Sequence, residues 1–112
     1  MKARIPNQGG GQAAMMKKLQ QMQDDMARIQ TECEEAEYTA SAGGGAVEAV
    51  VTGKHQVVSI KLQKDVVDPE DVDMLEDLIV ASVNEAMRKA DETMETKMGA
   101  ITGGLNIPGL GL

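Results

Sequence analysis

This sequence has few side chains of the types and spacing that catalysis or metal binding requires. Cys33 is the single cysteine and His55 the single histidine of the 112-residue chain, and they stand far apart in it. Without a second Cys or His nearby, neither a zinc-ligand set nor a thiol activated by an imidazole is predicted. The acidic residues between Asp68 and Asp77 are better explained as the start of a helix, whose dipole favours carboxylates in its first turn. We therefore expect no metal site and no enzyme activity.

Small-molecule substrates and cofactors are not expected either. The glycine triplet at 43–45 leads into the strand-like run AVEAVV and lacks the Lys-Ser/Thr pair of a phosphate-binding loop. Tyr38 is the single aromatic residue, so the chain has no platform on which the bases of a single strand would stack.

Cationic side chains are the remaining candidates for a binding function. The net charge is −7, yet residues 1–30 carry five basic and two acidic side chains, whereas residues 31–112 carry six and sixteen. Lys and Arg bind the phosphates of duplex DNA largely without regard to sequence. The first candidates for such contacts are Lys17, Lys18 and Arg28, with Lys2 and Arg4. Second-rank candidates are Arg88, Lys89 and Lys97, because the acidic residues Glu85, Asp91 and Glu92 are close enough along a helix to pair with them.

A long helix is predicted from residue 13 to about residue 37, where neither Gly nor Pro occurs. Its apolar residues recur at alternating spacings of four and three, which is the heptad pattern of a helix that packs against another helix. This seam consists of Met15, Leu19, Met22, Met26, Ile29 and Cys33, and we expect it to form a dimer interface. The helix would be roughly 35–40 Å long, so part of it should project from a small domain.

Strands are predicted between residues 43 and 62. Val and Ile alternate with other residues in two runs separated by Gly53-Lys54, which favours an antiparallel hairpin with a two-residue type II′ turn. The glycines at 43–45 mark a second break in the ladder, and the segment 38–41 is a candidate third strand. One face of this small antiparallel meander needs cover.

A second helix is predicted after the sequence Asp68-Pro69, with Asp68 as the N-cap and Pro69 at the first helical position. Its apolar stripe is wide enough to contact both a sheet and another helix, and Gly99 or Gly103 can end it. We accordingly divide the chain into a flexible arm at 1–12, one α+β domain at 13–99 and a mobile Gly/Pro-rich tail at 100–112.

The core material is thin for a domain that folds alone. Leu, Ile and Val total 23 of 112 residues, Phe and Trp are absent, and nine Met supply adaptable filling. We therefore expect a homodimer. The N-terminal residues lack the apolar segment of a signal peptide, and no run reaches the roughly 18 apolar residues of a membrane span, so a cytoplasmic location and no membrane partner are expected.

Several segments together resemble the YbaB/EbfC family of bacterial nucleoid-associated proteins. The segments are MMKKLQQMQDDM at 15–26, the glycines at 43–45, VTGKHQV at 51–57, LEDLIVASVNEAMRKA at 75–90 and KMGAITGGLNIPGL at 97–110. The resemblance implies an α–β–β–β–α protomer with a three-stranded antiparallel meander between two long helices. It also implies a homodimer with projecting paired helices, broad binding of double-stranded DNA in the nucleoid, and no catalysis.

Two other functions are compatible with the residues alone. A helix–hairpin–helix plan with Met-rich helix ends is also that of prefoldin-like holdase chaperones, although such helices contain more heptads. A non-catalytic protein-interaction adaptor with an acidic surface is the other alternative. Duplex binding that weakens steeply with salt would distinguish DNA binding from the holdase and adaptor functions.

Overall fold

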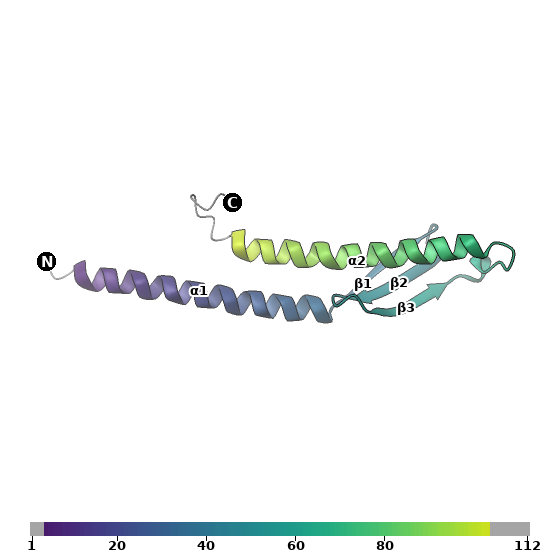
Figure 1. The fold of residues 1–112 in the computed structure, drawn as a ribbon. Helices are drawn as coiled ribbons and strands as arrows, with labels where there is room; N and C mark the ends of the chain where they lie inside the picture. The colour runs from purple at the N-terminus through teal and green to yellow at the C-terminus, as the bar shows by residue number, and fades with distance from the viewer. Residues whose placement is uncertain (1–3, 104–112) are drawn as a thin grey trace.

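The computed structural model describes residues 4–103 and confirms the predicted α+β class (Figure 1). Two long helices flank a three-stranded sheet, and the molecule is elongated, with extents of 86 × 26 × 16 Å. The elements are α1 (Arg4–Glu35), β1 (Glu37–Ala42), β2 (Val47–Thr52), β3 (Val57–Leu62), the short 3-10 helix η1 (Lys64–Val66) and α2 (Val72–Gly103). Neither helix has a stretch that is long and apolar enough to cross a membrane within this range.

The sheet is the predicted antiparallel meander, with strand order β1-β2-β3. Val47, Ala49 and Val51 alternate along β2 and are fully buried, as the period-2 pattern of the sequence indicates. Gly43, Gly44 and Gly45 form the turn between β1 and β2, and all three have positive φ, which explains why glycine stands at each position.

The turn between β2 and β3 differs from the predicted type II′ turn. Thr52 and Gln56 close a three-residue loop, in which the Thr52 N–H donates to the Gln56 carbonyl at 2.8 Å. His55 adopts the left-handed conformation with φ 64°, whereas Gly53 does not have a positive φ. The prediction was wrong because it assigned the conformational role of the turn to its one glycine. A Cβ atom at Gly53 would instead collide with the Cys33 backbone, so glycine at this position permits a close contact with α1.

Helix α2 covers one face of the sheet, over β1 and β2 (Figure 1). The contact is made by small side chains, because Ala86 packs against Ala40 and Val51, with Tyr38 and Met87 at its border. The same face of β3 has no such cover. Ile60 and Leu62 pair with Ala49 and Val47 in the register, so they lie on the face that α2 covers elsewhere.

The start of α2 differs from the predicted one, and of the two predicted ends, Gly99 and Gly103, the helix reaches the second. The side chain of Asp71, not that of Asp68, caps the helix by accepting a hydrogen bond from the Met74 N–H at 3.4 Å. Asp68 instead accepts from the Glu70 N–H at 3.0 Å, so Asp68-Pro69 forms a turn that precedes the helix. The helix then runs to Gly103, which places residues 100–103 in α2 and not in the predicted tail. The rest of that tail, 104–112, lies outside the described residues.

Helix α1 begins at Arg4, nine residues before the predicted start at residue 13. Pro6 lies in its first turn, where the missing N–H costs no hydrogen bond. Residues 4–12 of the predicted arm are thus helical, and residues 1–3 lie outside the described range.

The seam of α1 faces α2, which runs antiparallel to it and ends before it (Figure 1). Burial along the seam follows this overlap: Cys33 is 2% exposed, Leu19 39% and Met15 55%. Met22, Met26 and Ile29 are half-buried. The partner helix for the second half of the seam is therefore α2 of the same chain.

Candidate nucleic-acid interface

The end of α1 that extends past α2 carries Lys17 and Lys18. Both side chains are exposed, and so is every residue from 11 to 21. Among the side chains of residues 11–103, neither lysine has a partner in an ion pair or a side-chain hydrogen bond. Two adjacent ammonium groups with no carboxylate partner are thus available to an anionic ligand. Of the other N-terminal candidates, Lys2 lies outside the described residues, and Arg4 is the first residue of α1.

Arg28, the third first-rank candidate, is engaged within its own helix. Its guanidinium contacts Asp25 at 3.3 Å and Glu32 at 3.3 Å, one turn before and one turn after it. The hydrogen bond to Asp25, followed by that to Glu32 and its charge, raises the pKa of Arg28 above its ordinary value. An arginine between two carboxylates offers less net charge to a phosphate than Lys17 or Lys18. The structure does not bring Arg28 together with them.

The second-rank candidates on α2 are also occupied. Arg88 pairs with Glu85 through a hydrogen bond of 2.9 Å from its Nε, and it forms a further ion pair with Glu92. The hydrogen bond from Arg88 lowers the pKa of Glu85. Lys89 donates from its Nζ to the Thr39 carbonyl of β1 at 2.9 Å. Arg88 thus pairs with the neighbours expected from the helical spacing, whereas Lys89 bonds to a strand that is distant in sequence.

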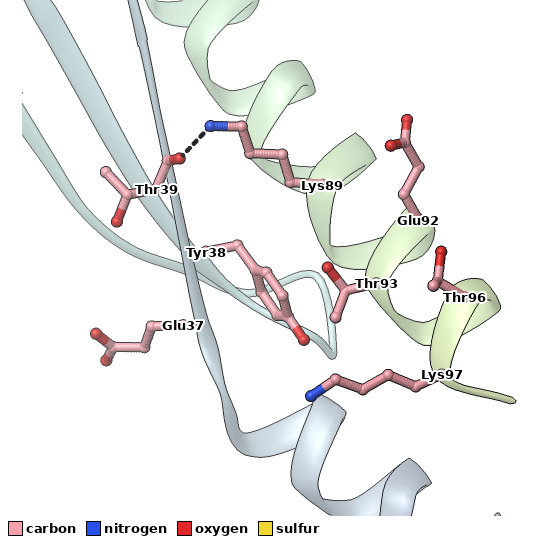
Figure 2. Close-up of a pocket in the computed structure, with 8 residues that line it drawn as sticks. All are labelled: Glu37, Tyr38, Thr39, Lys89, Glu92, Thr93, Thr96 and Lys97. Carbon is pink, nitrogen blue, oxygen red and sulfur yellow. Dashed lines mark hydrogen bonds between the residues drawn. The ribbon is translucent and has the colours of Figure 1, made fainter. Parts of the chain in front are cut away.

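Lys89 and Lys97 line a cavity of about 470 Å³ between β1 and the second half of α2 (Figure 2). Glu37 and Glu92 line the same cavity, so its formal charges balance. Tyr38 projects between the two elements, and Lys97 extends toward the end of α1 (Figure 2). A cavity with balanced charge does not attract a polyanion as a whole, which leaves Lys97 a weaker candidate than Lys17 and Lys18.

Three further lysines, which were not among the predicted contacts, are exposed. Lys54 lies in the β2–β3 turn, Lys61 on β3 and Lys64 in η1. Lys61 stands opposite Glu48 in the strand register. These residues are spread over the body of the molecule, so they do not form a compact basic patch with the end of α1.

The polar residues considered for chemistry have structural partners. Cys33 is buried, and its carbonyl accepts a hydrogen bond from the Tyr38 hydroxyl at 3.1 Å. His55 pairs through Nε2 with Asp91 Oδ1 at 2.7 Å, which joins the β2–β3 turn to α2. No set of three His, Cys, Asp or Glu side chains is placed to hold a metal ion in the part of the chain that the structure describes.

The fold and the projecting helix define a class of small α+β proteins in which two long helices extend beyond a three-stranded sheet. The model of the YbaB/EbfC DNA-binding family matches residues 8–105, and the chain belongs to this family. The resemblance predicted from the sequence is thereby confirmed.

Close relatives carry the name of nucleoid-associated proteins. One from Alkaliphilus metalliredigens is 55% identical over 108 residues, which cover 95% of this chain and 95% of the relative. Another, from Clostridium novyi, is 50% identical with the same coverage of both chains. The crystal structure of the uncharacterized protein HP0035 from Helicobacter pylori aligns with a TM-score of 0.57 at 16% identity, over 73% of this chain and 86% of that one. At this identity the similarity supports the fold alone.

Proposed function

We propose that this protein is a nucleoid-associated protein of the bacterial cytoplasm that binds duplex DNA as a homodimer, through Lys17 and Lys18 of α1. The proposal rests on which basic side chains form ion pairs with carboxylates and which do not. Arg28 and Arg88 are paired with carboxylates, whereas Lys17 and Lys18 are exposed and unpaired among the side chains of residues 11–103. They also lie where α1 extends past the acidic α2, so DNA can approach them without meeting the acidic body.

Recognition of this kind depends on phosphates and not on base edges. A lysine is a flexible point charge, and it binds phosphate in any sequence context. The exposed surface around the two lysines offers no aromatic side chain that would stack on bases. We therefore infer broad binding with little sequence preference, and no catalytic step.

The homodimer is supported by apolar surface that the single chain leaves exposed. Val57 and Val58 of β3 are each 49% exposed, Leu62 is 41% exposed, and Val80 of α2 is 57% exposed. Apolar residues clustered on a sheet face and the adjoining helix mark an interaction site. A second copy of the chain is the occupant that we propose for it, because the core of one copy is thin. Met15 and Leu19 of the seam remain exposed as well and would extend this interface along α1.

A gel-shift titration on several unrelated duplexes tests the proposal. The double variant Lys17→Glu and Lys18→Glu should lose binding to all duplexes alike, whereas the control Lys54→Glu and Lys64→Glu carries the same charge change on the body and should retain most of it. Circular dichroism and light scattering should show the fold and a mass of two chains for both. Equal binding by the two double variants would contradict the proposed contact surface.

A holdase function is the second candidate, and it rests on the exposed Met15, Met16 and Leu19 at the end of α1. Flexible Met side chains adapt to varied apolar segments. Suppression of client aggregation that persists at high salt, together with no duplex binding at low salt, would favour this candidate over DNA binding.

A further inference from the structure

The junction between α1 and the sheet is short, and hydrogen bonds hold it on both sides. Ala36 alone separates the last residue of α1 from the first residue of β1, and its N–H donates to the Glu32 carbonyl at 3.0 Å. The Tyr38 hydroxyl reaches back to the Cys33 carbonyl at 3.1 Å. Cys33 itself is 2% exposed. These contacts hold the last turn of α1 against the start of β1.

The β2–β3 turn closes the other side of this junction through Gly53. A Cβ atom at Gly53 would lie 1.9 Å from the Cys33 carbonyl oxygen, 2.7 Å from the Cys33 carbonyl carbon and 2.8 Å from the Glu34 Cα. All three atoms belong to the backbone of α1, so no side-chain rotation would relieve the contact. Any residue other than glycine must therefore move the turn away from the end of α1.

The same turn is also attached to α2. His55 contacts Asp91 at 2.7 Å, so the turn lies between the two long helices and contacts both. Displacement of α1 at Gly53 would thus alter the angle between α1 and the sheet, and α1 would shift along the seam that it shares with α2.

Small angular changes at this junction become large at the end of α1. Lys17 precedes Cys33 by 16 residues, which corresponds to about 24 Å along a helix. A rotation of about 10° at Cys33 would move Lys17 by roughly 4 Å, and successive phosphates of one DNA strand are spaced by about 3.4 Å along the duplex axis.

We propose that Gly53 is a positioning residue for DNA binding: its missing side chain sets the direction of α1 and thereby the place where Lys17 and Lys18 of the two copies meet the duplex. This inference rests on the proposed function for its consequence, although the geometry of the junction can be tested without DNA.

The direct test is a distance measurement on the full chain. Spin labels attached through p-acetylphenylalanine at Gln20 and Gln63 leave Cys33 untouched, and dilution with unlabelled protein restricts the signal to one chain. Gly53→Ala should shift the mean distance by several ångströms. Gly99→Ala is the control, because Gly99 of α2 has open space around its Cβ position and, like Gly53, no positive φ. If Gly53→Ala gives the distance distribution of the parent, or if Gly99→Ala shifts it by the same amount, the inference is wrong.

Duplex binding supplies a second readout that loss of stability alone would not change. With both helix ends engaged, four lysines imply a slope of log affinity against log salt of about −3.6. Both copies of folded Gly53→Ala protein carry the displaced helix, so a duplex that meets the lysines of one copy no longer meets those of the other. The slope should then fall to roughly −1.8. An unchanged slope and affinity in Gly53→Ala would overturn the positioning role.

If Gly53→Ala does not fold, Tyr38→Phe removes one hydrogen bond between the last turn of α1 and β1 and should broaden or shift the distance distribution. An unchanged distribution in Tyr38→Phe would then show that the contacts of this junction do not set the direction of α1, and it would overturn the inference. If the parent binds no duplex, the proposed function fails, whereas the distance measurement still decides whether Gly53 sets the direction of α1.

Discussion

Replacement of Ala86 by leucine tests whether α2 packs on the sheet through small side chains. Ala86 is fully buried, and its neighbours Ala40 and Val51 are 4% and 0% exposed. A leucine adds three carbon atoms where the helix and the sheet are in contact, so either the two layers separate or the side chain leaves its preferred rotamer. Overpacking of this kind costs about 1–3 kcal/mol and occasionally more. That is a large part of the roughly 5–15 kcal/mol by which domains are stable.

Ala81→Leu is the matched control, because Ala81 is exposed on the same helix and has the same starting residue. Exposed substitutions of this type change stability by about 0.5 kcal/mol or less. Urea unfolding followed by circular dichroism at one fixed protein concentration compares the two variants, since association would make the midpoint depend on concentration. Equal midpoints for Ala86→Leu and Ala81→Leu would refute the packing described for α2.

Three further predictions concern stability and use the same unfolding assay. Met26→Glu should cost several kcal/mol, because Met26 is half-buried in the seam and an ionised carboxylate there has no partner; a loss below about 0.5 kcal/mol would show that the seam is open to water. Asp71→Ala should cost about 1 kcal/mol by removing the cap on the Met74 N–H, whereas Asp68→Ala should cost less, and the reverse order would contradict the observed helix start. Burial raises the pKa of the Tyr38 hydroxyl above 10.0, so the unfolded chain loses this proton first and the free energy of unfolding should fall as pH rises through 10.0. Tyr38→Phe should lack this loss of stability at alkaline pH, and an equal loss in Tyr38→Phe would assign it to other groups.

The fold was largely predictable because its elements leave strong local patterns. The heptad spacing located the helix that became α1, and the alternation of Val and Ile located β2 and β3. The segment 38–41 gave a weaker signal, since Ala and Ser have little strand preference, yet it forms most of β1. The cap of α2 was misplaced because two aspartates, Asp68 and Asp71, both precede a helical pattern, and only tertiary placement selects between them.

The site was predictable in part. Lys17 and Lys18 are exposed, as their position outside the seam indicates. The pairing of Arg28 was visible in the sequence, because Asp25 and Glu32 stand three and four residues from it. Local spacing does not reveal the contact of Gly53 with Cys33, since it joins a turn to a helix end 20 residues away in the sequence. Nor does a heptad seam state whether its partner helix belongs to the same chain, and here α2 fills that role over half the seam.

The salt dependence of duplex binding tests the central claim most directly. If two copies each contribute Lys17 and Lys18, the four contacts predict a log–log slope of about −3.6, which is on the order of a hundredfold weaker binding at 200 mM than at 50 mM salt. The Lys17→Glu and Lys18→Glu variant should lose this dependence together with its affinity. A slope near zero in the parent, or the parental slope in this variant, would contradict DNA binding through the end of α1.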